Sequence, residues 1–230
     1  MKYSRHHPPC FKGDDFLRKC GRMKYCKQYE LSGSPIKPDR IVLMSRSPRR
    51  RELLAFLQPE VDSVDLDERA IEDHFEEVFR EDNYLDRSCK ICCELAKAKS
   101  GDREEENTLY ISSDTIVLHR NQIYNKPNTL EEARTMLRSY LGEVHTVATA
   151  VCLRAKNYLD VFYTLANVHF VPESPFINRL LEDFLATGSS LDKSGAYAIQ
   201  ELHPALVDYI EGDIHTIIGL PVAAIMQRLC

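Results

Sequence analysis

Glycine is scarce in this sequence, and the common glycine-rich nucleotide-binding loops are missing. The nine glycines are widely spaced, so neither a Walker A loop nor a GxGxxG motif occurs. The zinc-binding motif HExxH is absent as well. These absences exclude P-loop and Rossmann-type nucleotide binding, and they exclude the HExxH class of metalloprotease.

Long apolar runs are also missing. No run approaches the length of a membrane span, and the first apolar cluster is too short and too charged for a secretory signal. The eight cysteines are scattered along the chain, a pattern that favours free thiols in a reducing compartment over structural disulfides. We therefore expect a cytoplasmic protein without a membrane segment.

Charge is distributed unevenly along the chain, whose net charge is −5. Residues 1–40 contain ten lysines and arginines but only four acidic residues, and the rest of the chain is strongly acidic. An acidic body argues against a nucleic acid polymer as the main partner. It suits a small anionic substrate that is held by a few placed cations.

The chain divides into a basic N-terminal extension and one domain. Residues 1–39 show little hydrophobic periodicity, which predicts a loosely ordered segment. Residues 40–230 alternate between strand and helix patterns, with strands expected at 41–44, 61–64, 109–118, 122–124, 144–153, 158–171 and 207–210 and helices at 48–57, 83–100, 129–141, 175–185 and 221–229. This order predicts an α/β or mixed α+β domain, with helices on the faces of a sheet.

The segment 40–57, RIVLMSRSPRRRELLAFL, reads as a strand, a polar turn and an amphipathic helix. Ser47 can cap that helix, and Pro48 suits its first position. Three arginines follow in the first turn, where unpaired N–H groups and the helix dipole favour acidic residues instead. The pattern predicts an anion site such as a phosphate cradle, with a solvated basic patch as the alternative.

Asp114 lies inside the apolar strand pattern LYISSDTIVL. Aspartate is disfavoured in strands, and an unpaired buried charge is costly. We therefore expect Asp114 to meet a cation, a metal or a proton-transfer task, whereas a bulge or a strand-end cap is the alternative.

Two lysines and a glutamine are further candidates. Lys99 lies at the end of a helical apolar stripe, and Lys126 lies in a loop before Pro127, so either could neutralise phosphate or remain on the surface. Gln200 follows a short apolar stretch, and its paired donor and acceptor groups suit the edge of a base.

One segment imitates the zinc deaminase signature H-x-E…C-x-x-C. His74 and Glu76 precede Cys89 and Cys92, but only twelve residues separate Glu76 from Cys89, and Ser88 stands where proline is usual. So short a gap leaves little room for the helix and strand between two metal-bearing helix starts. The two cysteines are therefore predicted to be apolar helix positions.

Taken in order, several segments resemble motifs of the Maf family of nucleoside triphosphate pyrophosphatases. The matching segments are MSRSPRRRELL, ELAKAK, SSDTIV, NKPNTLEEARTML, GEVHTVATAV, DKSGAYAIQ and IEGDIHTIIGLP. The resemblance covers about residues 40–229. It implies a twisted mixed sheet flanked by helices, arranged in two lobes with a central cleft.

The resemblance also implies a reaction and its residues. A nucleoside triphosphate would be hydrolysed to the monophosphate and pyrophosphate with a divalent cation, Mg²⁺ or Mn²⁺, held by Glu68 and Asp114. Asp114 would also activate the attacking water. The other catalytic residues would be Lys99, Lys126 and Arg50, and the substrate-binding residues would be Ser45, Ser47, Arg49, Thr115 and Gln200.

Arg49, Thr115 and Gln200 stand at three positions that vary with specificity in the family. Their combination resembles the branch that acts on dTTP and UTP, with modified pyrimidine nucleotides as further candidates. The resemblance implies that the protein forms a homodimer. It also implies that the molecule it binds is its nucleoside triphosphate substrate. Two other functions stay open: a nucleotide-binding regulatory protein without significant turnover, and a general phosphatase that acts on simple esters.

Overall fold

The computed structural model describes residues 25–229. Its strands are β1 (Cys26–Gly33), β2 (Arg40–Met44), β3 (Glu60–Asp62), β4 (Thr108–His119), β5 (Gln122–Ile123), β6 (Val144–Ala155), β7 (Tyr158–Phe170) and β8 (Val207–Gly212). Its α-helices are α2 (Pro48–Leu53), α3 (Glu68–Val78), α4 (Tyr84–Ser100), α5 (Leu130–Tyr140), α6 (Pro175–Ala186), α7 (Ile214–Ile218) and α8 (Val222–Leu229). Short 3-10 helices occupy Ala55–Leu57, Ser194–Ala196 and Pro204–Leu206.

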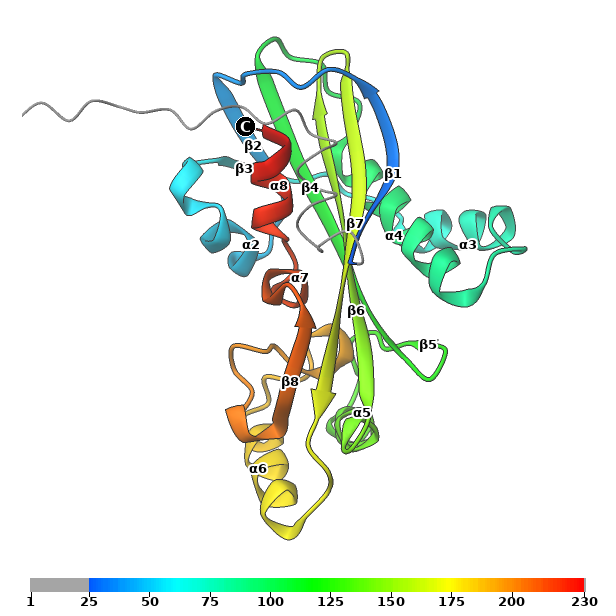
Figure 1. Ribbon diagram of the computed structural model, residues 1–230, viewed down its shortest axis with the longest axis vertical. Coiled ribbons are helices and arrows are strands. Elements are labelled where there is room, and N and C mark those ends of the chain that lie inside the picture. The colour runs from blue at the N-terminus through cyan, green and yellow to red at the C-terminus, as the bar shows by residue number, and fades with distance from the viewer. Residues whose placement is uncertain (1–24, 230) are drawn as a thin grey trace, which may run out of the picture.

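The strands form one mixed sheet of eight strands in the order β1-β7-β6-β4-β2-β3, with β5 added to β4 and β8 added to β7. Strand β2 runs parallel to both β3 and β4, and the other pairings are antiparallel. The strands twist strongly, and β6 and β7 run through both halves of the molecule (Figure 1). The predicted mixed sheet flanked by helices is confirmed.

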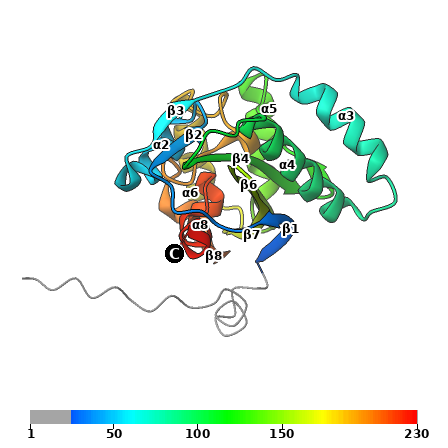
Figure 2. The same cartoon turned by 90° about the horizontal axis from the view of Figure 1, so that it is seen from above.

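The helices divide between two lobes at the ends of the long strands. In one lobe, α4 covers one face of the sheet while α2 and α8 lie against the other, as Figure 2 shows from above. In the second lobe, α5 and α6 pack around an apolar core that includes Leu137, Tyr140, Leu181 and Phe184. Each lobe therefore has a core of its own, and the shared strands join them.

Strand β4 has an open edge in the middle of the molecule. Strand β2 pairs with β4 only as far as Leu43 opposite Ile111, because the chain then turns away into α2. Strand β5 resumes the pairing near Leu118. Between these two points β4 lacks a strand on that side, so the side chains of both its faces can reach one cavity.

Most of the predicted elements are present with small shifts of their ends. Helix α4 begins after Asn83, whose side chain accepts from the N–H of Asp86, and it ends before Gly101. Helix α5 begins after Thr129, which accepts from the N–H of Glu132 as the capping pattern indicates. Helices α3 and α7 were not predicted from the sequence.

Strand β1 lies in the segment that was expected to be loosely ordered, and for this strand that expectation is wrong. It pairs antiparallel with β7, from Cys26 opposite Thr164 to Gly33 opposite Tyr158. Polar contacts add to the pairing, since Lys97 binds Glu30 at 2.6 Å. Its stability comes from a distant partner and not from apolar periodicity of its own. Residues 1–24 of the predicted extension lie outside the described residues.

Within residues 25–229, no helix is both long enough and apolar enough to span a membrane.

Removing β1 should destabilise the protein. We expect a chain that begins at Asp39 to melt at a lower temperature than a chain that begins at Tyr25, which retains the whole pairing with β7. Backbone hydrogen bonds contribute about 1 kcal/mol each, so the loss of several should lower the Tm by at least about 4 °C in a domain of this size. Differential scanning calorimetry of the two chains measures it. Equal melting temperatures would show that β1 is not part of the cooperative fold.

Candidate active site

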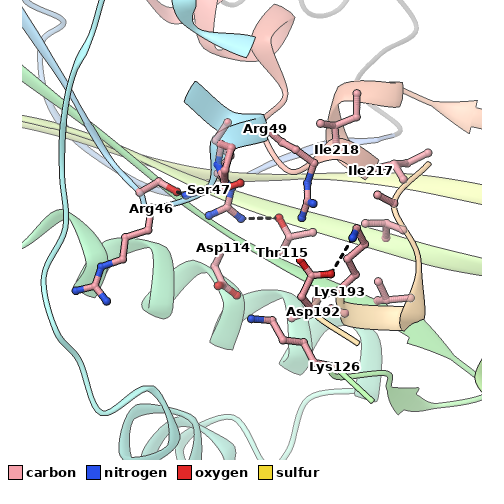
Figure 3. A pocket seen from close by; sticks show the side chains of 18 of the residues that line it. Arg46, Ser47, Arg49, Asp114, Thr115, Lys126, Asp192, Lys193, Ile217 and Ile218 are labelled. Atoms are coloured by element: carbon pink, nitrogen blue, oxygen red, sulfur yellow. Dashed lines mark hydrogen bonds and ion pairs between the residues drawn. The ribbon is translucent and has the colours of Figure 1, made fainter. Parts of the chain in front are cut away.

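A cavity of about 640 Å³ lies where β2 ends and the edge of β4 is open. All ten residues predicted for the site line it: Ser45, Ser47, Arg49, Arg50, Glu68, Lys99, Asp114, Thr115, Lys126 and Gln200. They come from the turn after β2, from α2, α3 and α4, from β4, and from two loops of the other lobe. Figure 3 shows five of them around this space: Ser47, Arg49, Asp114, Thr115 and Lys126.

The turn after β2 is built by backbone contacts. Ser45 is buried, and its Oγ accepts from the N–H of Ser47 at 3.2 Å. Ser47 occupies the N-cap position of α2 and Pro48 begins the helix, but the Ser47 side chain makes no capping hydrogen bond. The position was therefore predicted correctly and the side-chain cap was not. The first turn of α2 contains no acidic residue.

Arg50 is a cation whose hydrogen bonds hold the site together. Its Nη1 donates to the carbonyl of Ser113 at 2.8 Å, its Nη2 to Thr115 Oγ1 at 3.0 Å, and its Nε to the carbonyl of Gly219 at 2.9 Å. Burial lowers the pKa of Arg50, and the nearby Asp114 carboxylate opposes that shift. Since Ser113 and Thr115 flank Asp114 in β4, Arg50 fixes the stretch of strand that carries the carboxylate.

Asp114 points from β4 toward α4 and meets the predicted cation. Lys99 Nζ lies 2.7 Å from Asp114 Oδ1 and 3.0 Å from Glu68 Oε2. Burial lowers the pKa of Lys99, but the two carboxylates outweigh burial and the net shift is upward. Lys99 is therefore an ammonium that links α3 to β4. The alternatives of a bulge or a strand-end cap do not apply, because Asp114 stays in register opposite Ala150.

Two other cations that line the cavity form no ion pair with the described part of the protein. Arg49 and Lys126 make no ion pair or hydrogen bond to any residue in the described part of the chain. Both side chains extend into the cavity, Arg49 from α2 and Lys126 from the loop of the opposite lobe (Figure 3). These two groups are free to receive an anion. The solvated-patch interpretation of the arginine cluster still suits Arg51, which is exposed.

The segment 192–200 forms the wall of the second lobe and contains residues that the site prediction did not include. Lys193 is buried, and its Nζ contacts the carbonyl of Ser189 at 2.7 Å, Asp192 Oδ1 at 2.7 Å and Glu201 Oε2 at 3.1 Å. Lys193 thereby closes the loop that presents Gln200 to the cavity. The motif DKSGAYAIQ indicated this segment in the sequence. Nothing in the motif predicted that its lysine contacts three local partners.

Tyr197 anchors the same wall to the sheet. Its hydroxyl lies 2.7 Å from Nε2 of His145, and both residues are buried in a cluster of aromatic rings. Burial lowers the pKa of His145 to about 3, so the ring is neutral at physiological pH. The wall beside Gln200 is therefore held by a neutral hydrogen bond.

The acidic residues do not form a complete metal site by themselves. Within residues 25–229, no group of three or more His, Cys, Asp or Glu side chains could hold a metal ion. Cys89 and Cys92 are buried on α4, which confirms the prediction that they are apolar helix positions. Glu68 and Asp114 offer oxygen atoms on either side of Lys99. A cation such as Mg²⁺ would need further oxygens, such as those of a bound polyphosphate.

Gly219 is a position where only glycine fits well. Its φ is +113°, and a Cβ there would lie 3.2 Å from Thr115 Oγ1 and 3.3 Å from Arg50 Nε. We expect Gly219→Ala to lower the free energy of unfolding by about 1–3 kcal/mol through backbone strain, with an added cost from displacing Arg50.

The matched control is Gly188→Ala. Gly188 also has a positive φ, +72°, but a Cβ there would meet nothing within 4 Å. Urea denaturation should show the larger loss in Gly219→Ala. Equal losses in the two variants would show that crowding of Arg50 carries no cost.

Comparison with known proteins places the chain in a family. The family described as "Maf-like protein" matches residues 40–230. The dTTP/UTP pyrophosphatase of Thermotoga petrophila is 36% identical over 194 residues, which cover 83% of this chain and 88% of that protein. The dTTP/UTP pyrophosphatases of Lachnoclostridium phytofermentans and Thermosipho melanesiensis are 36% and 35% identical, and the matches cover 82% of this chain and 93% and 96% of those proteins. The chain therefore belongs to the Maf-like protein family.

Proposed function

We propose that this protein hydrolyses dTTP and UTP to the monophosphate and pyrophosphate, with a divalent cation. The observation that carries the proposal is the cavity at the open edge of β4. Asp114 of β4 is bound there by Lys99, while Arg49 and Lys126 form no ion pair within residues 25–229. The names of the related proteins specify the same reaction class.

Asp114 is the group that acts on water in this proposal. Its Oδ1 lies 2.7 Å from Nζ of Lys99, and this contact holds the carboxylate at the cavity, where it can accept a proton from water. Attack of the oriented water on the α-phosphorus breaks the α–β anhydride bond, so the products are the monophosphate and pyrophosphate. Arg50 supports this step by fixing the strand on both sides of Asp114.

Arg49 and Lys126 neutralise the triphosphate. They face the cavity from opposite lobes and form no ion pair or hydrogen bond within residues 25–229, although the charge of Arg49 acts on the nearby Asp192. Binding a polyanion therefore breaks no ion pair. Ser45 and Ser47 provide further donors at the start of α2. Charge that develops on the leaving pyrophosphate is offset by these groups in the transition state.

Glu68 and Asp114 would hold the divalent cation together with phosphate oxygens. Hard oxygen donors fit Mg²⁺ or Mn²⁺, and both carboxylates line the cavity beside the proposed phosphate position. The cation would supply charge neutralisation on the phosphates. Chelation with EDTA should therefore abolish turnover, and added Mg²⁺ should restore it.

Product analysis tests the reaction type. Incubation with dTTP and Mg²⁺, followed by anion-exchange chromatography, should yield dTMP and pyrophosphate in equal amounts. Stepwise release of single phosphates, or hydrolysis of p-nitrophenyl phosphate, would instead indicate a general phosphatase. Tight nucleotide binding without any product would favour the regulatory alternative.

Replacing Asp114 tests its role in the chemical step. Asp114→Asn should lower kcat at least about 100-fold, the range of a lost general base, while nucleotide affinity changes only a few-fold because the carboxylate acts mainly in the transition state. Asp208→Asn is the control, since it makes the same change at an exposed carboxylate of β8 that does not line the cavity. More than about a tenth of wild-type kcat in Asp114→Asn is incompatible with the proposed role.

Base preference is proposed to depend on Gln200 and Thr115. Both line the cavity, and the Thr115 hydroxyl is held 2.9 Å from Thr149 Oγ1. A site that pairs with the edge of a base rejects other bases because its own polar groups would stay unpaired. We expect kcat/KM for dTTP and UTP to exceed that for purine nucleotides at least about tenfold. A panel that includes modified pyrimidine nucleotides and 7-methyl-GTP measures this, and preference for 7-methyl-GTP would contradict it.

The cellular setting belongs to the same proposal. We propose that the protein acts in the cytoplasm as a homodimer, with no nucleic acid polymer as partner, and that the catalytic domain comprises residues 40–230 with β1 added to its sheet. Analytical ultracentrifugation of the full chain tests the dimer.

A further inference from the structure

The thiol of Cys92 contacts the oxygen of Asp114 that Lys99 leaves free. Cys92 Sγ lies 3.4 Å from Asp114 Oδ2, while Lys99 Nζ lies 2.7 Å from Asp114 Oδ1. The Cys92 side chain is completely buried, and Asp114 is 9% exposed. Both oxygens of this carboxylate are therefore contacted by side chains of the single helix α4.

The spacing along α4 makes this arrangement possible. Cys92 and Lys99 are seven residues apart, which is two helical turns, so they share one face of the helix. Between them, the carbonyl of Ala96 accepts a hydrogen bond from Ser112 Oγ at 2.5 Å. This contact fixes the position of α4 along β4, and so it sets where both side chains meet Asp114.

The thiol is the donor in this contact. An ionised carboxylate only accepts hydrogen bonds, whereas a thiol can donate one. Cys92 Sγ lies 3.4 Å from Oδ2, within the distance of a hydrogen bond that a thiol donates. Cys93 is equally buried, but no hydrogen bond joins it to Asp114 within residues 25–229.

We propose that Cys92 is a positioning residue for Asp114: its S–H donates to Oδ2 and, together with Lys99 on Oδ1, fixes the rotation of the carboxylate toward the cavity. The inference rests on the proposed role of Asp114 in hydrolysis. A carboxylate that is bound at one oxygen only can rotate about its Cβ–Cγ bond. The second contact removes that freedom before the substrate arrives, as a preorganised site requires.

The competing explanation is that Cys92 only fills space in the core between α4 and the sheet. Cys92→Val has a similar volume without a donor, and Cys92→Ser keeps a donor. Cys93→Val makes the same change one residue further on, in the same core cluster but away from the carboxylate. Comparing the three variants separates loss of the S–H donor from loss of packing.

Steady-state kinetics with dTTP provide the first test. We expect Cys92→Val to lower kcat about three- to tenfold, as the loss of one modest hydrogen bond in the transition state would, with KM and Tm close to wild type. Cys92→Ser should restore kcat to within about twofold, and Cys93→Val should leave it unchanged. Unchanged kcat in Cys92→Val, or equal losses in Cys92→Val and Cys93→Val, would overturn the inference.

Infrared spectroscopy provides a test that does not depend on turnover. The difference spectrum between wild type and Cys92→Val isolates the S–H stretching band of Cys92, and donation to a carboxylate should place that band below the band isolated in the same way for Cys93. In Asp114→Asn, where the acceptor is neutral, the Cys92 band should move to higher frequency. Bands at the same frequency for the two thiols would show that no such hydrogen bond exists.

The two proposals fail in different ways. If wild-type protein makes no dTMP under any metal, the proposed function is wrong, and the positioning role fails with it whatever the infrared band shows. If wild-type protein is active and Cys92→Val is equally active, only the inference about Cys92 is wrong.

Discussion

The buried guanidinium of Arg50 is the interaction on which the site depends. A buried charge is costly unless its hydrogen bonds are satisfied, and Arg50 satisfies three of them with Ser113, Thr115 and Gly219. These acceptors lie 63 to 169 residues away in the sequence. One side chain therefore holds together the turn after β2, the middle of β4 and the end of α7, and none of the three could move without leaving a donor unpaired.

The early end of β2 converts this anchored framework into a cavity. If β2 continued alongside β4, its backbone would cover the edge beside Asp114 and Thr115. Because the chain turns into α2 instead, residues from both faces of β4 reach the same space. Asp114 meets α4 on one face, while Thr115 meets Arg50 and Thr149 on the other. The carboxylate and Thr115, one of the two groups proposed to read the base, are thus adjacent residues of one strand.

The sequence predicted the elements whose signals are local. Helices α4 and α5 have caps and apolar stripes of their own. The cost of an unpaired aspartate in a strand predicted that Asp114 meets a cation, a metal or a proton-transfer task, and Lys99 is the cation that it meets. Strand β1 was missed because its stability depends on pairing with β7, more than 120 residues away. The position of Arg50 was predicted but not its contacts, because two of its three partners are backbone carbonyls, which no residue type reveals.

The cations of the site differ in what they already bind, and this difference indicates where a polyphosphate can enter. Lys193 is bound by two carboxylates and a carbonyl, Lys99 by Asp114 and Glu68, and Arg50 by the protein framework. The charges of the two lysines are offset by carboxylates, and the donors of Arg50 are bound by neutral acceptors, before any ligand arrives. Arg49 and Lys126 have no such partners within residues 25–229, and they extend from opposite lobes. An anion that contacts both would bridge the lobes. This arrangement suits the polyphosphate chain of the proposed substrate, whose successive phosphate groups can be bound by cations from different elements.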